Sequence, residues 1–501
     1  MNIAGIAEER VKEQGERLSL IYEGKEMTNV EMIRASRRLA RTLKDLGVNQ
    51  GDRVILQMPN CPEVLQSFGA IWRIGAVVVP VNYLVGEEKT AYIYQDSGAK
   101  VVISSSAFLP KIRAAKAKAP GLETVILIDP EVPQGFLSYP HLVEKKPEAM
   151  EVVDMDDDEL AALIYTAGTT GWPKGVMHTH LSLYENARMG FETVPLPDGL
   201  VSVFVLPLCH SYGIASMNQG LFRRRGRVIL LNSFSVEAIF VAIEKYRADS
   251  LAGVPTMYVY MLLFPEPKKY DLISMKYWFS GSAPLALETF NRFKEVFGFE
   301  IIEGWGLTEA GANNAANPLE GVKKVGSIGL PMKGMEMRVV DNKGNPLPAR
   351  KEGEIVIRGP MLMKGYWNKP EETAEVLRGG WLYTGDVGYV DDDGYFWITD
   401  RKKDLIIKAG ENISPRTIEE VLFGHPKVSE AAVIGTKDEL YGEDIKAFVV
   451  LKPGQEATAE EIIEYCRGKL TNFLLPKEVA FLNALPKNLV GKVLKKELRK
   501  L

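Results

Sequence analysis

The chain has 501 residues, of which 46% are hydrophobic and 25% are charged. This length exceeds what a single hydrophobic core usually supports, so we expect two or more domains. The 61 Lys and Arg residues against 65 Asp and Glu residues give a formal net charge of −4, which provides no general attraction to nucleic acid or to an anionic membrane surface.

The apolar stretches and the first residues predict no membrane segment. The most apolar stretch, 70–81, is interrupted by Arg73 and closed by Pro80, whereas a spanning helix needs roughly 18 or more apolar residues. The start of the chain is charged by Glu8 and lacks the apolar core of a signal peptide. Three widely spaced cysteines form no metal-binding spacing and argue against disulfides. We therefore expect a reduced, cytoplasmic protein without nucleic-acid or integral-membrane partners, and we leave open whether it is a homodimer.

Helix-like and strand-like segments alternate through the first half of the chain. A helix is predicted over 29–47, because apolar residues recur at helical spacing and Gly47 is a good stop signal. The next segments read in turn as strand, helix, strand, helix and strand, over 51–59, 63–76, 77–81, 85–99 and 100–106. This alternation predicts parallel sheets covered by helices, and hence an α/β fold.

The pattern changes between 325 and 400. Short β-rich runs are separated by turn sequences such as Asn-Lys-Gly and Asp-Asp-Gly, which predict antiparallel hairpins and a small β-barrel-like subdomain. Helix and strand then alternate again over about 100 residues, an ordinary length for a small domain. We therefore predict a large domain at 1–402 and a small α+β domain at 403–501.

The segment YTAGTTGWPKGV at 165–176 follows an apolar run that predicts a strand. Its glycines allow close approach of backbone N–H groups to an anion, its threonines add hydroxyl donors, and Lys174 adds a positive charge. These features suit a polyphosphate. However, Gly175 stands where a Walker loop has Ser or Thr, so the geometry must differ from that loop. A flexible surface hairpin is the alternative reading of the same glycines.

The whole string resembles the signature of the adenylate-forming enzymes, which include acyl- and aryl-CoA synthetases, firefly-type luciferases and peptide-synthetase adenylation domains. One position departs, because Ala167 stands where serine is usual and removes one hydroxyl donor. Further segments resemble the family's motifs, in the family's order, along nearly the whole chain. They are LPLCHSYG at 206–213, GSAPL at 281–285, EGWGLTE at 303–309, YTGD at 383–386, DRKKDLIIKAGENISP at 400–415 and PKNLVGKVLKKEL at 486–498.

The resemblance implies two half-reactions, with ATP/AMP, Mg²⁺ and coenzyme A as cofactors. A carboxylate attacks the α-phosphate of ATP to give an acyl-adenylate and pyrophosphate, and the thiol of coenzyme A then displaces AMP. Because two anions must meet in the first step, the site must neutralise the charge that develops. The partners implied are therefore a small carboxylic acid and coenzyme A.

The resemblance also implies which residues hold the nucleotide. Thr308 should donate to the α-phosphate and Glu309 should bind Mg²⁺, since carboxylates suit this hard cation. Asp386 should accept both ribose hydroxyls, helped by Arg401. The β- and γ-phosphates are assigned to Thr166, Ala167, Gly168, Thr169, Thr170, Gly171 and Lys174. The adenine and its surroundings are assigned to Ser282, Ala283, Pro284, Glu303, Gly304, Trp305 and Gly306.

Lys492 is the residue to which the resemblance gives the central role in adenylation. A lysine reaching between the carboxylate and the α-phosphate would offset their charge as a compact cation. The alternative is a solvated lysine in a basic tail. The family swings its small domain between two poses, for which Lys403 occupies the hinge position. In the second pose Gly410 should replace Lys492 and line the coenzyme A tunnel, although the same KAGEN segment also suits a helix N-terminal turn.

The acyl pocket is predicted around His210, which flanks the carboxylate or the thioester tunnel in the family; a satisfied core histidine is the alternative. Cys209 beside it would point to the opposite face of a strand. His178 and His180 would share a strand face, which makes a metal pair conceivable. The rest of the pocket is assigned by analogy to Tyr212, Trp278, Phe279, Gly281, Ala310 and Ala312, with Gly304 and Gly306. Small residues among larger ones indicate a medium-chain, branched, alicyclic or aryl acid.

The leading hypothesis is an acid–CoA ligase that forms AMP. Its rivals are a stand-alone enzyme that loads a carrier-protein thiol, a luciferase-type oxygenase, and a nucleotide-binding pseudoenzyme. An amino-acid substrate is disfavoured, because Ser235 stands where an ammonium-binding Asp would be expected. The chemistry is reversible, so the sequence leaves open whether the enzyme consumes or makes ATP.

Overall fold

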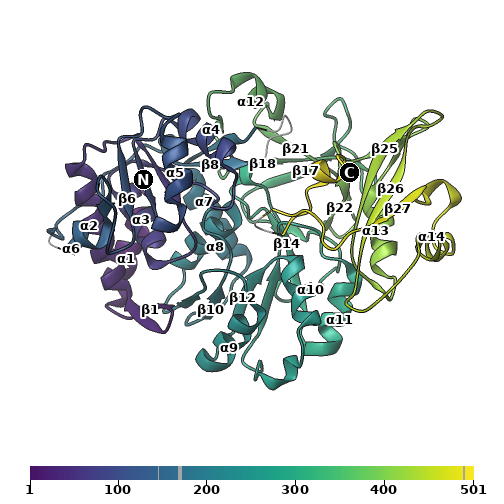
Figure 1. Cartoon of the computed structure of the whole chain (residues 1–501), viewed down its shortest axis with the longest axis horizontal. Coiled ribbons are helices and arrows are strands. Elements are labelled where there is room, and N and C mark those ends of the chain that lie inside the picture. Colours follow the sequence, from purple (N-terminus) through teal and green to yellow (C-terminus); the bar gives the residue numbers. More distant parts are fainter. Residues whose placement is uncertain (145, 167–171, 489–490) are drawn as a thin grey trace.

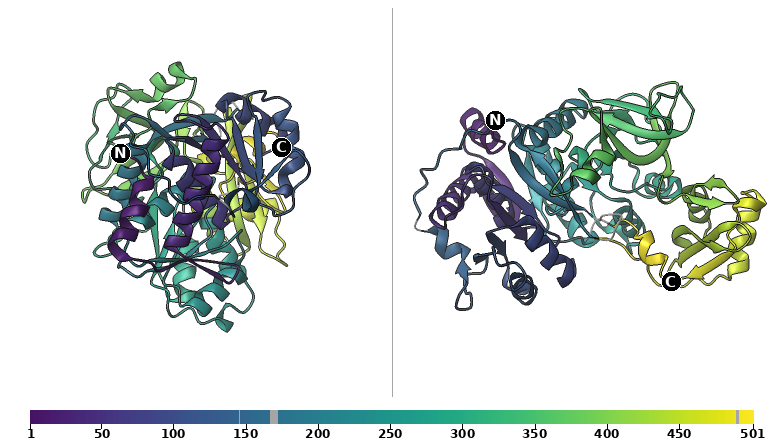
Figure 2. Two further views of the ribbon diagram at one scale, coloured as in Figure 1. Left: turned by 90° about the vertical axis from the view of Figure 1, so that its left-hand side faces the viewer. Right: turned by 90° about the horizontal axis from the view of Figure 1, so that it is seen from above.

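The computed structural model describes residues 1–144, 146–166, 172–488 and 491–501. Within these residues the chain forms four β-sheets with helices packed against them (Figure 1). Two large sheets come first along the chain, a smaller antiparallel sheet follows, and the fourth sheet lies in the C-terminal residues. Figure 2 shows the C-terminal part as a lobe at one end of the molecule.

The first large sheet has the strand order β19-β9-β8-β4-β3-β5-β6-β7. Its strands are β3 (Arg53–Gln57), β4 (Val77–Pro80), β5 (Val101–Ser104), β6 (Thr124–Leu127), β7 (Leu137–Ser138), β8 (Leu160–Thr166), β9 (Lys174–Thr179) and β19 (Gly365–Tyr366). Strands β3 to β8 pair in parallel, whereas β9 pairs antiparallel with both β8 and β19. All four residues of β4 are buried, as expected for a parallel strand covered on both faces.

Helices connect these strands. They are α2 (Asn29–Asp45), α3 (Pro62–Arg73), α4 (Glu87–Ser97), α5 (Leu109–Lys116) and α6 (Tyr139–Glu144), with a short 3-10 turn at Ser106–Phe108. Helix α2 begins with a capping box, in which the Thr28 side chain accepts from the Glu31 N–H and the Glu31 carboxylate accepts from the Thr28 N–H. The chain leaves this helix through Gly47 at φ 82°, which favours glycine.

The second large sheet has the strand order β16-β15-β14-β13-β12-β10-β11-β1-β2. Its strands are β1 (Leu18–Tyr22), β2 (Lys25–Thr28), β10 (Val201–Phe204), β11 (Arg227–Leu230), β12 (Ser250–Gly253), β13 (Tyr277–Ser280), β14 (Ile301–Trp305), β15 (Ala315–Ala316) and β16 (Leu330–Pro331). Its helices are α1 (Ala4–Gln14), α7 (His180–Thr193), α8 (Ser211–Leu221), α9 (Val236–Tyr246), α10 (Pro255–Leu263) and α11 (Leu287–Phe297). Strands β10 to β14 are parallel, so their carboxyl ends meet at one edge.

The third sheet is antiparallel and follows the order β17-β18-β21-β20, with β22 against β21. Its strands are β17 (Glu336–Val340), β18 (Gly353–Arg358), β20 (Leu377–Arg378), β21 (Trp381–Val390) and β22 (Phe396–Arg401), and α12 (Pro370–Val376) precedes β20. The antiparallel hairpins predicted between 325 and 400 are present.

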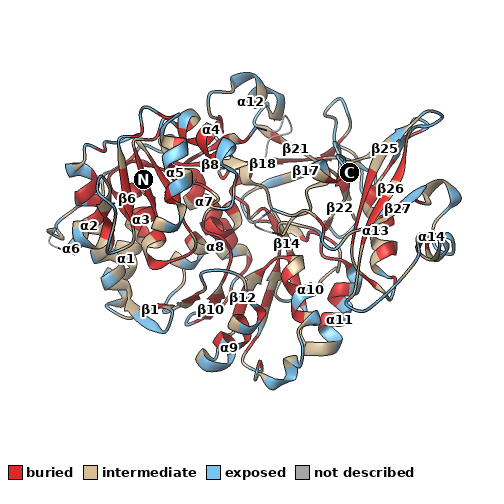
Figure 3. Ribbon diagram, viewed as in Figure 1, coloured by how far each residue is buried: buried red, intermediate tan, exposed pale blue. Residues whose placement is uncertain are grey.

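The C-terminal sheet has the order β24-β23-β26-β25, with β27 against β26. Its elements are β23 (Ile406–Lys408), β24 (Glu411–Ile413), α13 (Pro415–Phe423), β25 (Val428–Asp438), β26 (Gly442–Leu451), α14 (Ala459–Arg467), β27 (Glu478–Phe481) and α15 (Lys495–Leu498). Helices α13 and α14 and these strands enclose a buried core of their own, seen in Figure 3 as red on the inner faces. The boundary at 402/403 stays a prediction, and it falls between the end of β22 and the start of β23.

The predicted α/β fold class is confirmed. The reading of KAGEN as a helix N-terminal turn is wrong, because Ala409 and Gly410 form the two-residue turn of the β23–β24 hairpin, at φ 49° and 82°. No helix in the described residues is both long and apolar enough to cross a membrane.

Candidate active site

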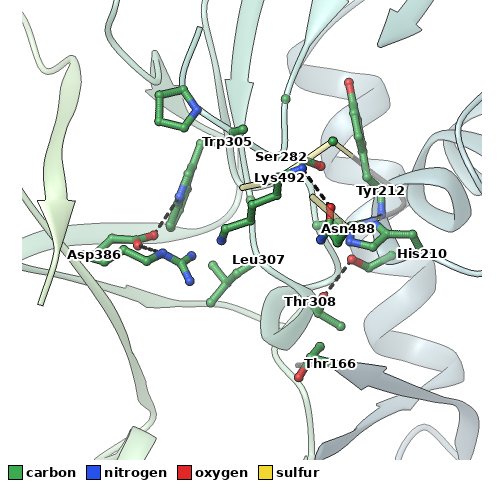
Figure 4. A pocket seen from close by; sticks show the side chains of 18 of the residues that line it. Thr166, His210, Tyr212, Ser282, Trp305, Leu307, Thr308, Asp386, Asn488 and Lys492 are labelled. Carbon is green, nitrogen blue, oxygen red and sulfur yellow. Dashed lines mark hydrogen bonds and ion pairs between the residues drawn. The ribbon is translucent and has the colours of Figure 1, made fainter. Parts of the chain in front are cut away.

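A cleft of about 1960 Å³ lies where the sheets meet the C-terminal lobe (Figure 4). The segments that follow β10, β13 and β14 all line it. The cleft thus lies at the carboxyl ends of these parallel strands, where ligands usually bind in such sheets. These segments are 206–213, 281–285 and 306–309, which carry the predicted motifs. The third sheet contributes Asp386 and Arg401, and the C-terminal lobe contributes Lys492.

Asp386, on β21 of the third sheet, contacts a residue at the end of β14 through its side chain. Its side chain is 2% exposed. One carboxylate oxygen is 2.8 Å from Nε of Arg401, and the other accepts a 3.0 Å hydrogen bond from Nε1 of Trp305. Both contacts are drawn in Figure 4. The structure thus brings together the three residues predicted for ribose and adenine, with the carboxylate held in one orientation before a nucleotide arrives.

Thr308 begins a 3-10 turn (Thr308–Ala310) directly after the β14 motif. Its Oγ1 lies 2.9 Å from Oγ of Ser211, the first residue of α8. Its carbonyl oxygen lies 2.6 Å from Nε2 of His178 on β9. Burial lowers the pKa of His178 to about 4, so the neutral ring donates to this carbonyl. His178 thereby positions Thr308, a role that the sequence reading missed.

The prediction that His178 and His180 share a strand face is wrong. His178 lies near the end of β9, whereas His180 is the first residue of α7. The described residues contain no group of three or more His, Cys, Asp or Glu side chains placed to hold a metal ion. A single carboxylate is enough for Mg²⁺ when phosphate oxygens complete its shell, and Glu309 lines the cleft beside Thr308.

Two further contacts hold charged groups at this end of the cleft. Oε1 of Glu309 accepts a 2.9 Å hydrogen bond from the Tyr366 hydroxyl on β19. Lys174, at the start of β9, forms an ion pair with Glu372 of α12 and lies 4.9 Å from the centroid of the Tyr366 ring. Neither Tyr366 nor Glu372 was predicted. Both are far in sequence from the motifs, and no local pattern marks them.

Of the predicted phosphate-binding segment, the structure describes Thr166 and Lys174. They pair across β8 and β9 and both line the cleft. Ala167, Gly168, Thr169, Thr170 and Gly171 lie outside the described residues.

Lys492 enters the cleft from the C-terminal lobe, and Figure 4 shows its side chain extending between Trp305 and Thr308. Burial, followed by the nearby Arg401 guanidinium and the Lys403 ammonium, lowers the pKa of Lys492 to about 8. Its backbone N–H donates to Oδ1 of Asn488 at 2.9 Å. The turn is anchored to the large part of the chain by Thr256, whose Oγ1 lies 3.2 Å from the Gly491 carbonyl. The solvated-tail reading of Lys492 does not fit this placement.

His210 precedes α8 and lines the cleft. Its Nδ1 accepts from the Tyr212 N–H at 3.3 Å. Burial, reinforced by Lys492, lowers the pKa of His210 to about 4, so the ring is neutral. Cys209 and His210 lie in a turn after β10 rather than on a strand, so the argument from strand alternation is wrong. Burial raises the pKa of Cys209 to about 12, which leaves the thiol unreactive.

Two of the residues predicted for the acyl pocket do not reach it. Trp278 is fully buried on the other face of β13, where its ring packs 5.2 Å from that of Phe293. Ala310 is fully buried behind the Thr308 turn. The error at Trp278 follows from strand alternation: Phe279 faces the cleft, so the adjacent Trp278 must face the other side of the sheet. Tyr212, Phe279, Gly281 and Ala312 do line the cleft.

Backbone constraints shape the adenine side of the cleft. Ser282 and Ala312 have φ of 70° and 81°, a strained region for non-glycine residues that is often found at functional sites. A Cβ on Gly306 would lie 1.7 Å from the Ala312 carbonyl oxygen, so only glycine fits there. The other predicted residues, Ala283, Pro284, Glu303, Gly304 and Lys403, also line the cleft. Burial raises the pKa of Glu303 to about 7, opposed by Arg416.

Gly410 is exposed at the tip of the β23–β24 hairpin, and Lys492 is in the cleft. The structure therefore corresponds to the predicted pose in which the lysine faces the nucleotide site. The assignment of Gly410 to coenzyme A stays a prediction for the other pose.

Comparisons with known proteins agree with this geometry. The profile of the family described as AMP-binding enzyme matches residues 7–367, and that of the AMP-binding enzyme C-terminal domain matches residues 417–492. A long-chain-fatty-acid–CoA ligase of Bacillus subtilis (strain 168) is 36% identical, covering 96% of this chain and 91% of the relative. A feruloyl-CoA synthase of an Amycolatopsis species is 35% identical, covering 95% of this chain and 94% of the relative. The crystal structure of the anthranilate CoA ligase AuaEII with anthranoyl-AMP has a TM-score of 0.94 at 28% identity, covering 100% of this chain and 97% of the other.

Proposed function

The chain belongs to the AMP-binding enzyme family, and we propose that it activates a medium-chain, branched, alicyclic or aryl carboxylic acid. It is an AMP-forming acyl-CoA synthetase, whose cofactors are ATP, Mg²⁺ and coenzyme A. The proposal therefore concerns the acid and the roles of individual residues in this reaction.

The observation that carries the choice of acid is the wall of the cleft beside α8. Gly281 and Ala312 contribute little side chain to this wall, which leaves room for an acyl group. The Tyr212 ring narrows the same space, since a Cβ on Gly281 would lie 3.3 Å from it. A mixture of small residues and one large ring favours a substrate of moderate width. The relatives are named for long-chain fatty, feruloyl and anthranilate acids, so the two aryl acids lie within the proposed class and the long-chain fatty acids lie outside it.

In the first half-reaction Lys492 would lie between the acid carboxylate and the α-phosphate. A cation held there offsets the charge of the pentavalent transition state more than that of the separate reactants, which lowers the barrier. Thr308 would donate its hydroxyl to the α-phosphate, with its position set by His178 and Ser211. Asp386 would exchange its contact with Trp305 for the ribose hydroxyls. Mg²⁺ bound by Glu309 would neutralise charge on the phosphate oxygens.

In the second half-reaction the lobe that carries Lys492 would turn about Lys403, as the family does. This movement would withdraw the lysine and bring the Ala409–Gly410 hairpin tip to the cleft. The tip has no side chain beyond Cβ, so the narrow pantetheine arm could pass close to the backbone. The thiol would then attack the acyl carbonyl, and AMP would leave.

A panel of carboxylic acids of graded length and shape tests the proposal. We expect AMP release that requires both an acid and coenzyme A, with highest kcat/KM for acids of the proposed class. Highest kcat/KM for long straight-chain acids would contradict the proposed acid. AMP release that required a carrier protein instead of coenzyme A would support the carrier-loading alternative, and absence of ATP–pyrophosphate exchange would indicate an inactive fold.

The same site can run the reaction in either direction, because an acyl-adenylate and a thioester are both activated acyl groups. In reverse it would make ATP and coenzyme A from acyl-CoA, AMP and pyrophosphate. Supplying these three reactants and measuring ATP gives the relative rate of the reverse direction.

A further inference from the structure

One face of α8 lines the cleft along the whole length of the helix. Tyr212, Ser216 and Gln219 lie on the helix and Arg223 follows just after its end, and all four line the same cavity. Their spacing of four, three and four positions places them on one helix face. At 1.5 Å per residue, the stripe from Tyr212 to Arg223 is about 16 Å long. It leads away from the Thr308 end, where Ser211 and Tyr212 begin the helix.

The end of this channel far from Thr308 is polar. Ser202 and Ser250, near the starts of β10 and β12, line the cavity with their hydroxyl oxygens 2.7 Å apart. The turn that carries Arg223 is joined to the same end of β10, since the Gly199 N–H donates to the Arg224 carbonyl at 2.8 Å. Arg223 and the two serines thus lie at the end of the sheet opposite to the nucleotide motifs.

Arg223 has no counterion in the described part of the chain. Its Nε is buried without a hydrogen-bond partner, and no ion pair or side-chain hydrogen bond to a described residue involves its guanidinium. Burial lowers the pKa of Arg223 to about 10, with no nearby carboxylate opposing the effect. Arg73 is a useful contrast, because this buried arginine pairs with Glu8 and with the Met150 carbonyl. Arg223 as a whole is half-buried, and its Nε is shielded from solvent. A partly desolvated cation without a partner is costly, so its position on a substrate channel suggests that the partner is a ligand.

We propose that the acid has a second carboxylate at its far end, which pairs with Arg223, so that the substrate is an α,ω-dicarboxylic acid. This inference rests on the proposed function and narrows its substrate class. Arg223 lines the same cavity, and a long arginine side chain occupies part of this stripe of about 16 Å, so roughly 10 Å would remain between the two carboxylates. That separation corresponds to a diacid of medium length. A guanidinium binds a carboxylate through two parallel hydrogen bonds, and the Gln219 amide and Ser216 hydroxyl line the approach.

Only one carboxyl group reacts in this arrangement. The carboxylate near Lys492 forms the bond to the α-phosphate as pyrophosphate leaves, and the sulfur of coenzyme A then replaces AMP. The far carboxylate stays ionised and keeps its contact with Arg223 through both steps. The product is therefore a mono-thioester with a free carboxylate, and the enzyme stops after one coupling.

The test compares straight-chain diacids with monoacids of equal carbon number, on the wild type, Arg223→Met and Arg224→Met. Methionine fills the channel wall without a charge. Arg224 is exposed and does not line the cavity, so its variant controls for loss of surface charge. We measure kcat/KM from acid-dependent AMP release with coenzyme A, and acid binding by calorimetry on the same proteins.

We expect the wild type to prefer a medium-length diacid to the matching monoacid. Arg223→Met should lower kcat/KM for the diacid about 10- to 100-fold, as for loss of a charged hydrogen bond, and should spare the monoacid, whereas Arg224→Met should keep the wild-type preference. A wild type that uses monoacids as well as or better than every diacid would overturn the inference and leave the ligase function standing. Absence of AMP release with every acid would refute the proposed function instead, and calorimetry would still test the diacid inference. Preferential binding of diacids that Arg223→Met abolishes would support the inference. Equal binding of diacids and monoacids would overturn it.

Discussion

The two ends of the cleft differ in how their charged groups are paired. At the nucleotide end Asp386 contacts Arg401 and Trp305, and Glu309 accepts from Tyr366. At the far end of the acyl channel the Arg223 guanidinium has no partner among the described residues. A nucleotide must therefore replace contacts that already exist, whereas an acidic substrate would supply a contact that is missing.

Polar groups therefore act in two different ways at the two ends of the cleft. Side chains that are held by their neighbours are preorganised, so little reorganisation is needed when charge develops on the phosphates. A cation without a protein partner contributes to selectivity, because a substrate that lacks a matching group leaves it unpaired. The first arrangement serves chemistry common to the family, and the second serves the choice of acid in this chain.

The largest expected effect is at Lys492, which lies in the cleft between its nucleotide end and its acyl end. Lys492→Ala should lower the rate of adenylation from ATP by about 10²–10³-fold, as for removal of one preorganised charge-stabilising donor, and should largely spare thioester formation from preformed acyl-adenylate. ATP–pyrophosphate exchange measures the first step, and single-turnover thioester formation measures the second. Lys437→Ala removes an exposed lysine of the C-terminal lobe that does not line the cleft, and should change neither rate. Equal loss of both steps in the Lys492 variant would assign the lysine to folding instead.

The second-largest expected effect is at Asp386, whose carboxylate is already held by Arg401 and Trp305. Asp386→Ala should weaken binding of ATP and AMP by about 10- to 100-fold, because hydrogen bonds to a charged group are worth roughly 1.5–3 kcal/mol. Calorimetric titration of AMP measures this loss without turnover. Asp392→Ala is a matched control, since Asp392 lies at the surface of the same sheet and pairs with Arg350. Unchanged affinity in the Asp386 variant would remove this carboxylate from the ribose site.

The pH dependence of adenylation should report the ionisation of Lys492. The group is cationic below its pKa of about 8, so kcat/KM should fall about tenfold per pH unit above this value as the charge is lost. Bound triphosphate favours the cation, and kcat should therefore fall at a higher pH than kcat/KM. Lys492→Arg should remove the fall, because a guanidinium keeps its charge. The same fall in this variant would assign the ionisation to another group.

Much of the nucleotide end could be predicted because the family motifs that the chain resembles there are short contiguous stretches. The 303–309 segment carries Trp305 and Thr308 in one stretch, and the ends of parallel strands bring such stretches to one edge. The predicted α/β alternation succeeded for the same reason, since helical and strand periodicity are local properties. The role of Tyr366 was missed because it reaches Glu309 from 57 positions away.

The acyl end was harder to predict. Trp278 was assigned to the pocket, but it faces the opposite side of β13, and only the register of the strand decides between the two faces. Arg223 was missed although it follows just after the end of α8, at helical spacing from Tyr212. The signal was present as a polar stripe at helical spacing, but a charged residue just after a helix is ordinarily exposed. Its partial burial depends on tertiary packing near the start of β10, which no local pattern shows.

The smallest expected effect tests whether pairing at the nucleotide end competes with the ligand. Glu372 holds Lys174 in an ion pair, and a phosphate must draw the lysine away from it. Glu372→Gln removes that competition, so KM for ATP should fall about two- to fivefold at low salt, in line with the small net energy of ion pairs that keep some contact with solvent. The gain should shrink as ionic strength rises, because screening weakens the pair in the wild type. Glu371→Gln, at the exposed neighbouring position, should leave KM unchanged. A rise in KM for ATP in Glu372→Gln would mean that the Glu372 carboxylate positions Lys174 to bind the phosphates. The ion pair at the nucleotide end would then help nucleotide binding instead of competing with it.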